Sequence, residues 1–390
     1  MRLIPIHLCK PGMRLGRKIY SHDGKVLLAE STVLTKTMIR RLAALGISFI
    51  YVYDERTDDV ELREWVDAEV RARAIAEIRR QFRRMMDEGG RKRHIGAFDK
   101  TFRSMLSALI DELASHPNAI MLLGDICTVD HYLYRHSLNV CLYAIGIGIS
   151  LGWDRDRLMT FGLGALLHDI GKLMVPQDIL LKPGKLTPEE FEAVKRHTEA
   201  GFDLLRGEPN IPMAVAYCAL QHHERLDGSG YPRGLKADEI QELAQWIGLI
   251  DAYDAMTSMR PYRKMMLPHE ALEVLYAGSG TLFDTKKIWH FRNQIAIYPI
   301  GMTVTLSTGE TGVVVDLNAG LPDRPVVRIF RDAEGVELSQ PYELDLSKKL
   351  NVVVTGVDEY DLLAERSEEA AGEEEDVEAF DVRLRVNAIN

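Results

Sequence analysis

Apolar residues occur on all sides of segment 154–167, and this pattern predicts a helix that is buried all round. Its apolar positions include Leu158, Phe161, Leu163, Leu166 and Leu167. Asp154 is suited to cap the start of this helix, and Gly171 is suited to end it. His168 and Asp169 lie side by side at its buried end, where an uncompensated charge is costly. The pair is therefore either a hydrogen-bonded structural pair or part of a metal site.

Residues 1–55 predict a small α+β unit. Short apolar runs indicate strands near 3–6 and 49–53, and residues 35–45 have a helical pattern. Asp23–Gly24 is a favourable hairpin turn between two extended runs. The unit carries no motif that indicates a chemical function.

Segment 62–86 is a charged helix whose apolar residues recur at mostly three- and four-residue steps, namely Val70, Ile75, Ile78, Phe82 and Met85. Two hypotheses explain this stripe: a homodimer through this N-terminal helix, or packing against the same chain. The pattern covers too few heptads to establish a coiled coil. The glycines and basic residues of segment 88–94 then indicate a break.

The pattern changes after Pro299 to short extended runs separated by turns. The runs cover residues 302–306, 312–317, 326–330 and 351–354. They predict a small β-rich unit, a barrel or a sheet. Because it lacks metal-ligand spacing and a strip of aromatic and basic residues, nucleic acid is not an expected partner.

The amino-acid composition limits the number of domains that the chain can form and indicates its cellular compartment. A chain of 390 residues, 46% hydrophobic and 27% charged, can form two or three domains. The net charge of −10 is concentrated in segment 365–381, which has nine acids and one arginine, so the tail is expected to be disordered and the body near neutral. We expect a cytoplasmic protein without a membrane span, because no signal peptide is evident and the longest apolar run, 140–151, is too short. Its four cysteines show neither metal-ligand nor disulfide spacing.

Further histidines strengthen the metal interpretation of His168 and Asp169. Candidate ligands in other helical segments are His136, His197, His222, His223 and Asp251. Residues 187–190 form a capping box, so one helix is expected to start there and to carry His197. Imidazole and carboxylate together suit iron, manganese or zinc. Five histidines and two aspartates are too many for one ion with an open position, so two ions bridged by Asp169 are favoured.

Five segments resemble, in order, the HD-GYP family, a bacterial branch of the HD-domain metal-dependent phosphohydrolases. They are Tyr132–Val140, His168–Lys172, Lys195–Gly201, His222–Pro232 and Asp251–Arg263. The resemblance covers residues 125–300 and implies an HD-type helical bundle within a mainly α protein. The expected domains are 1–60, small and α+β; 61–98, a charged helical connector; 99–298, catalytic; 299–360, β-rich; and 361–390, the acidic tail.

The resemblance implies hydrolysis of cyclic di-GMP to linear pGpG, with further hydrolysis to GMP left open, by a metal-activated hydroxide at a binuclear site. It implies seven metal ligands: His136, His168, Asp169, His197, His222, His223 and Asp251. Two divalent ions are expected, with iron or manganese favoured. Asp169 and Lys172 are the implied catalytic residues, and Lys172 would stabilise charge on the phosphate or protonate the leaving oxygen.

The substrate-binding residues implied by the resemblance are Lys172, Arg260, Arg263, Tyr231 and Pro232. The glycine-rich loop 225–235 is also the implied contact for a diguanylate cyclase or an adaptor. Asp254 is expected to orient a ligand. The chain departs from the HD-GYP pattern at one position. Some members of the family bind a third metal with a glutamate four residues before the first histidine of the motif. This chain has Tyr132 there, which favours two ions.

Three alternatives remain open from sequence. The chain could be an HD phosphohydrolase acting on another nucleotide, a di-iron oxygenase, or a non-catalytic cyclic-dinucleotide sensor or adaptor. The Gly-Tyr-Pro segment disfavours the first, and the complete ligand set with Lys172 disfavours the last. Product analysis with and without oxygen separates the oxygenase from the hydrolase.

Overall fold

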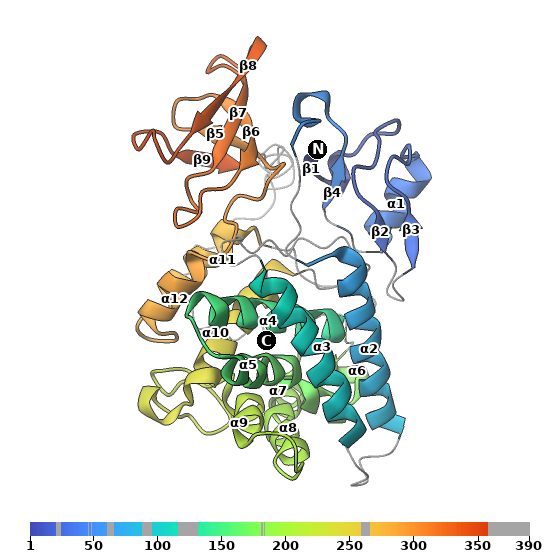
Figure 1. The fold of residues 1–390 in the computed structure, drawn as a ribbon, viewed down its shortest axis with the longest axis vertical. Helices are drawn as coiled ribbons and strands as arrows, with labels where there is room; N and C mark the ends of the chain where they lie inside the picture. The colour runs from blue at the N-terminus through green and yellow to red at the C-terminus, as the bar shows by residue number, and fades with distance from the viewer. Residues whose placement is uncertain are drawn as a thin grey trace.

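The computed structural model describes residues 1–20, 25–45, 47, 49–60, 66–87, 96–115, 132–180, 182, 184–258 and 266–357. They form a large helical unit with two smaller units above it (Figure 1). Each unit has its own hydrophobic cluster. This arrangement confirms the predicted fold class, a mainly α protein with a small α+β unit and a small β-rich unit. The proposed domain boundaries remain predictions.

The N-terminal unit consists of β1 (Arg2–Pro5), β2 (Ile19–Tyr20), β3 (Val26–Leu28), α1 (Lys36–Ala44) and β4 (Phe49–Val52). β1 pairs antiparallel with β4, and β2 pairs antiparallel with β3. α1 begins after Thr35, whose hydroxyl accepts the backbone N–H of Met38 at 3.2 Å. The predicted turn at residues 23–24 lies outside the described residues, as do segments 88–94 and 361–390.

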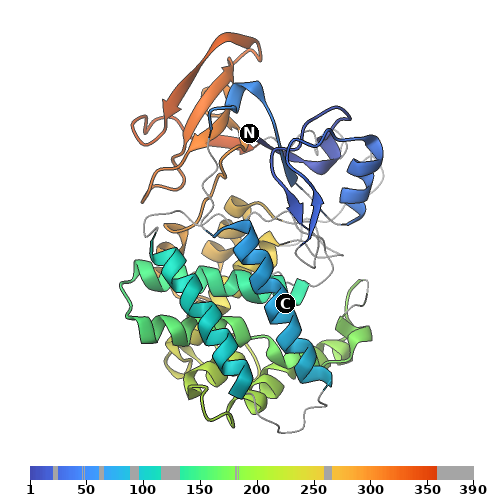
Figure 2. The same ribbon diagram turned by 45° about the vertical axis from the view of Figure 1, so that its right-hand side comes forward.

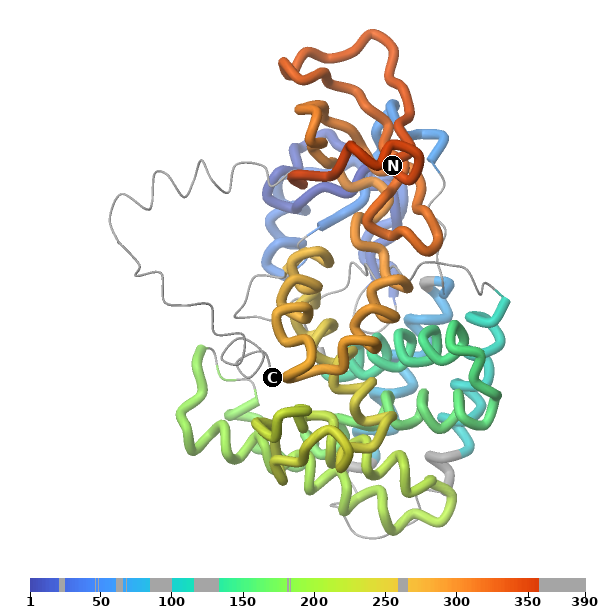
Figure 3. The backbone as a smooth tube through the Cα atoms, turned by 90° about the vertical axis from the view of Figure 1, so that its left-hand side faces the viewer, coloured from blue at the N-terminus to red at the C-terminus, as the bar shows by residue number. Residues whose placement is uncertain are grey.

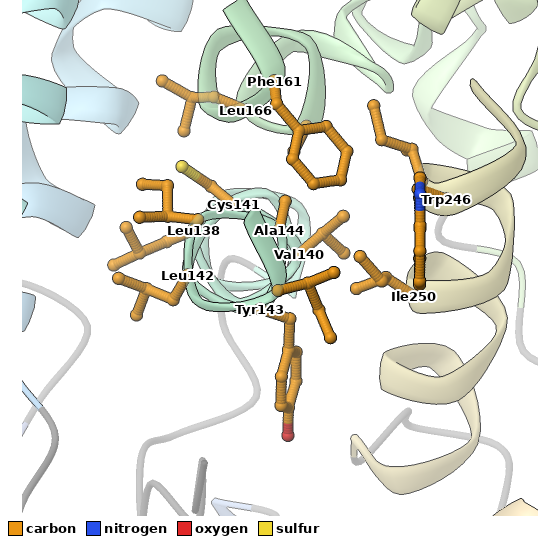
Figure 4. Packing of buried hydrophobic residues seen from close by; sticks show 14 of the residues in the cluster. Leu138, Val140, Cys141, Leu142, Tyr143, Ala144, Phe161, Leu166, Trp246 and Ile250 are labelled. Carbon is orange, nitrogen blue, oxygen red and sulfur yellow. The ribbon is translucent and has the colours of Figure 1, made fainter. Parts of the chain in front are cut away.

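The helical unit comprises α2 (Ala68–Asp87), α3 (Gly96–Ala114), α4 (Tyr132–Ser150), α5 (Arg155–Leu167), α6 (Gln177–Leu180), α7 (Pro188–Lys195), α8 (His197–Leu205), α9 (Met213–Gln221), α10 (Glu242–Thr257), α11 (Pro268–Ala277) and α12 (Thr285–Arg292). A 3-10 helix, η3 (Ile170–Met174), follows α5. α4 runs through the core, with Phe161 and Leu166 of α5 on one side and Trp246 and Ile250 of α10 on another (Figure 4). Because other helices pack around α4, each buried polar side chain of α4 needs a hydrogen-bonding or ionic partner on one of those helices.

The apolar stripe of α2 packs against the same chain. Ile75, Ile78 and Phe82 belong to the main core cluster, and the Phe82 ring meets those of Phe102 in α3 and Tyr134 in α4 edge-on. α2 and α3 lie along the same face of the helical unit (Figure 2). Of the two hypotheses for this stripe, the structure supports internal packing, since these side chains are covered and offer no apolar face to a second copy.

The C-terminal unit is a five-stranded antiparallel sheet with the order β8-β7-β6-β5-β9. Its strands are β5 (Thr303–Leu306), β6 (Thr311–Asp316), β7 (Val326–Arg331), β8 (Glu337–Asp345) and β9 (Val354–Val357). The sequence prediction missed β8, because this edge strand contains Pro341 and mostly polar residues. It also placed the last strand at 351–354, whereas β9 begins at Val354.

The two small units contact each other, and the sheet also contacts the helical unit. The backbone N–H of Leu3 donates to the carbonyl of Gly301 at 2.9 Å, and Arg328 pairs with Asp59 at 2.6 Å. Arg292 of α12 pairs with Asp323 at 2.7 Å. The N-terminal unit and the sheet lie next to each other in Figure 1, and the view turned by 90° shows both at the same end of the molecule (Figure 3).

Phe82→Ala tests whether α2 belongs to the core. Because the Phe82 side chain is fully buried, its removal should lower the free energy of unfolding by about 3–5 kcal/mol in urea titrations. Arg83→Ala, at the exposed neighbouring position, should change it by less than about 0.5 kcal/mol. Equal small effects of the two substitutions would mean that α2 is a detached connector.

Candidate metal centre

Three of the candidate ligands lie at helix ends that meet in the core. His168 is the C-cap of α5, His197 is the first residue of α8, and His222 is the C-cap of α9. His136 and Asp251 are inside α4 and α10. The prediction that His197 lies on the helix that begins at the capping box was wrong. That helix, α7, ends at Lys195, and His197 starts a new one.

Gly171 has a role other than the predicted helix stop. α5 already ends at Leu167, and Gly171 lies inside η3. A Cβ atom at Gly171 would overlap the carbonyl oxygen of His197 and crowd the backbone nitrogen of Gly201. Glycine is therefore needed for η3 and α8 to approach closely enough to bring Asp169 and His197 together.

The buried side chains form two groups, each able to hold a metal ion. One consists of Asp169, His197, His222 and His223, and the other consists of His136, His168 and Asp251. Within each group, one potential ligand atom per residue lies within 4.8 Å of the others. All seven predicted ligands are thus brought together, although their assignment as ligands remains a proposal.

Asp169 lies between the two groups and directs one carboxylate oxygen to each. Its Oδ1 is 3.4 Å from His197 Nε2 and 3.7 Å from His222 Nε2. Its Oδ2 is 3.4 Å from His168 Nε2 and 3.6 Å from His136 Nε2. This is the arrangement expected of a carboxylate that bridges two cations.

Asp251 and Lys172 complete the charged part of the cluster. Asp251 Oδ1 is 3.0 Å from His136 Nε2, and Asp251 Oδ2 is 3.9 Å from His223 Nδ1. Lys172 Nζ pairs with Asp169 Oδ2 at 2.7 Å. Only 14% of the Lys172 side chain is exposed, so its ammonium lies at the border between the buried cluster and solvent.

Burial keeps the histidines of the first group neutral. It lowers the pKa of His197 to about 3, and it lowers the pKa values of His222 and His223 as well. Burial alone would raise the pKa of Asp169, but Lys172 and His168 hold that pKa well below its usual range. The result is that His197, His222 and His223 are neutral beside an ionised Asp169, the protonation states that metal binding requires.

Several buried atoms indicate that the cluster is made for a cation. His168 Nε2, Asp169 Oδ1 and Asp251 Oδ2 make no hydrogen bond with the described residues. Buried polar atoms are normally paired, because leaving them unpaired costs free energy. Their convergence, in a set of nitrogen and oxygen donors, fits one or more divalent ions.

Neighbouring groups orient most of these imidazoles. His136 Nδ1 contacts Asp254 Oδ2 at 2.7 Å, and Asn139 Nδ2 donates to Asp254 Oδ1 at 2.9 Å. Asp254 therefore lies where it can orient His136, as predicted for it. His168 Nδ1 and His197 Nδ1 each contact the backbone carbonyl three residues earlier at 2.7 Å.

The structure brings Tyr231 to the cluster. Its ring stacks on that of His223, with a centroid distance of 4.6 Å. Pro232 follows in the same loop through a cis peptide bond. Arg260 and Arg263 lie outside the described residues, as does the Tyr132 side chain. The substrate-binding roles predicted for Tyr231, Pro232, Arg260 and Arg263 remain proposals.

Sequence reasoning missed two buried charged residues, Glu224 and Arg225. Arg225 Nη1 donates to the carbonyl of His222 at 3.0 Å, and the guanidinium lies over the ring of Phe283. Both Glu224 and Arg225 are at most 5% exposed. The sequence did offer one signal for these residues, because both follow directly after the two histidines in the segment that resembles the HD-GYP family.

Comparisons with known proteins identify two domains in the chain. Residues 109–286 match the family model described as HD domain, and residues 303–364 match that of a KOW domain associated with HD domain. A cyclic di-GMP phosphodiesterase of Pseudomonas aeruginosa is 39% identical over 231 residues, which are 58% of this chain and 56% of that protein. A cyclic di-GMP phosphodiesterase response regulator of Xanthomonas campestris is 44% identical over 137 residues, 35% of this chain and 36% of that protein.

A 3′3′-cGAMP-specific phosphodiesterase of Vibrio cholerae is 37% identical over 169 residues, 43% of this chain and 36% of that protein. The chain therefore spans about half or less of the length of these relatives. Its helical unit contains an HD domain, and these relatives agree with the resemblance of its motifs to HD-GYP proteins. Among the described residues, no helix is both long and apolar enough to cross a membrane.

Gly171→Ala tests the close approach of η3 and α8. The added methyl group must push the two segments apart, so affinity for Mn²⁺ should fall by about 10- to 100-fold in calorimetric titration. Gly207→Ala is the matched control, since a Cβ there meets nothing within 4 Å. Wild-type affinity in Gly171→Ala would contradict the proposed role.

Proposed function

We propose that this protein is a metal-dependent phosphodiesterase that hydrolyses cyclic di-GMP to linear pGpG, with GMP as a further product to be tested. The observation that carries the proposal is Asp169, which has one carboxylate oxygen toward each of two buried groups of potential ligands. Relatives named cyclic di-GMP phosphodiesterases support the substrate.

The proposed metal ligands are the seven residues of these groups: His136, His168, Asp169, His197, His222, His223 and Asp251. Two divalent ions, iron or manganese, fit this set of imidazole and carboxylate donors. When bound, they would supply a hydroxide at neutral pH and neutralise charge on the phosphodiester. Asp169 would serve both groups, because its two carboxylate oxygens face different histidines.

The reaction adds the oxygen of water to phosphorus and breaks the bond between phosphorus and the 3′ oxygen. Lys172 is placed for the second half of this step, because its ammonium lies beside Asp169 at the solvent border. There it can stabilise negative charge on the phosphate and give a proton to the leaving 3′ oxygen. Tyr231, Pro232, Arg260 and Arg263 are proposed to line the substrate side.

A second cyclic dinucleotide is the main alternative substrate, because one relative is named a 3′3′-cGAMP-specific phosphodiesterase. A non-catalytic sensor would bind the cyclic dinucleotide without turnover. A homodimer through α2 is not part of the proposal, since Ile75, Ile78 and Phe82 of that helix are buried in the core. A diguanylate cyclase or adaptor contact at loop 225–235 remains a hypothesis.

Hydrolysis is tested with protein purified without oxygen and loaded with Mn²⁺ or Fe²⁺. The wild type should convert cyclic di-GMP to pGpG, as measured by chromatography, and should do so faster than it converts 3′3′-cGAMP. Asp169→Ala should abolish both hydrolysis and metal loading, because it removes the carboxylate whose two oxygens face histidines of both groups. Asp178→Ala, an exposed carboxylate on α6, is the control and should retain both.

Lys172→Met separates the chemical step from metal binding. It should retain the metal content of the wild type but lower kcat by about 100- to 1,000-fold, since the group that stabilises charge and donates a proton is lost. A metal-loaded wild type that leaves cyclic di-GMP intact would reject the proposed substrate. Full activity of Asp169→Ala would reject the proposed site.

A further inference from the structure

Four of the five histidines in the metal centre are oriented by a hydrogen bond that points away from the cluster. In each case Nδ1 makes the contact, and the partners are Asp254 Oδ2 for His136 at 2.7 Å, the Ala165 carbonyl for His168 at 2.7 Å, the Val194 carbonyl for His197 at 2.7 Å and the Cys218 carbonyl for His222 at 3.0 Å. Such partners fix the ring orientation and tautomer of a ligating histidine and leave Nε2 facing the metal.

His223 differs from the other four. Both of its ring nitrogens are buried, and neither makes a hydrogen bond with any described residue. Its Nδ1 is 3.9 Å from Asp251 Oδ2, which is beyond hydrogen-bonding distance. The orientation of this imidazole must therefore come from packing.

Three rings pack on His223, and only that of Tyr231 is stacked on it, with 4.6 Å between centroids and 25° between planes. The His222 ring is tilted by 45° at 4.0 Å, and the His197 ring meets His223 edge-on at 5.0 Å. The backbone N–H of Tyr231 also donates to the carbonyl of His223 at 3.2 Å. We propose that Tyr231 is a positioning residue, which holds His223 in its metal-binding orientation by ring stacking in place of a hydrogen bond.

Glu224 holds the loop that carries Tyr231. Its Oε1 accepts the backbone N–H of Arg233 at 2.8 Å, and its Oε2 accepts that of Leu235 at 2.9 Å. Gly230 lies so close to the chain at residues 223–225 that a Cβ there would overlap backbone atoms. One buried carboxylate thus ties the far side of the loop to the residue next to His223, which keeps the Tyr231 ring in place.

This inference rests on the proposed metal site and concerns only one of its two groups. His223 belongs to the group with Asp169, His197 and His222, and not to the group of His136, His168 and Asp251. Loss of the stacking partner should therefore weaken one site and spare the other. A general loss of stability would weaken both.

The test is calorimetric titration of the metal-free protein with Mn²⁺ in the absence of oxygen. Wild-type protein should bind at two sites. Tyr231→Leu, which removes the aromatic face, should weaken one site by about 10- to 100-fold and leave the other within about twofold. Tyr231→Phe keeps the ring and should restore two-site binding.

Glu224→Gln tests the position of the Tyr231 ring indirectly, through the loop that carries it. It replaces one carboxylate oxygen with an amide that cannot accept from a backbone N–H, so it should weaken the same site as Tyr231→Leu. Glu239→Gln is the matched control, because Glu239 Oε2 also accepts a backbone N–H, that of Lys236 at 2.8 Å, but at an exposed position away from His223. It should bind as the wild type does.

The inference is overturned if Tyr231→Leu and Glu224→Gln bind Mn²⁺ at both sites within about twofold of wild type. It is also overturned if both sites weaken together, or if both variants lose their circular-dichroism signal, since the role would then be general stabilisation. The substrate proposal fails separately: a wild type that binds two Mn²⁺ ions without hydrolysing cyclic di-GMP leaves the inference standing.

Discussion

The buried carboxylate of Asp169 is the constraint on which the rest of the structure depends. An ionised group in a hydrophobic core is tolerated only with compensating partners, and here these are Lys172 and imidazoles from α4, α5, α8 and α9. Bringing those segments to one carboxylate requires α4 to run through the core and requires η3 to touch α8 at Gly171. The proposed chemistry uses the same property, because a carboxylate that faces two ligand groups can hold two cations.

Three of the proposed ligands lie at helix ends, where the direction of the chain can change. His168 and His222 are C-caps and His197 begins a helix, so their side chains converge while the apolar faces of α5, α8 and α9 stay in the core. The Nδ1 atoms of these three histidines contact nearby backbone carbonyls, so the free ends of the helices also orient the imidazoles. His223 has no such carbonyl contact, and the proposed positioning by the loop with Glu224 and Tyr231 takes its place.

Much of this could be predicted from local sequence. Apolar positions around 154–167 indicated a buried helix, the capping box indicated the start of α7, and ordered motifs indicated the seven clustered residues. Properties that depend on contacts distant in sequence could not be predicted. The role of Gly171 is set by the backbone of His197, and the burial of the α2 stripe is set by Phe102 and Tyr134. β8 was missed because its polar residues and Pro341 are tolerated only at a sheet edge.

The bridging role of Asp169 is tested by a crystal structure of the Mn²⁺-loaded protein, with anomalous diffraction measured near the manganese absorption edge. Two anomalous peaks are expected, one beside each carboxylate oxygen of Asp169. The first should lie among His197, His222 and His223, and the second among His136, His168 and Asp251. A single peak, or peaks away from Asp169, would contradict the bridging role on which the proposed phosphodiesterase chemistry depends.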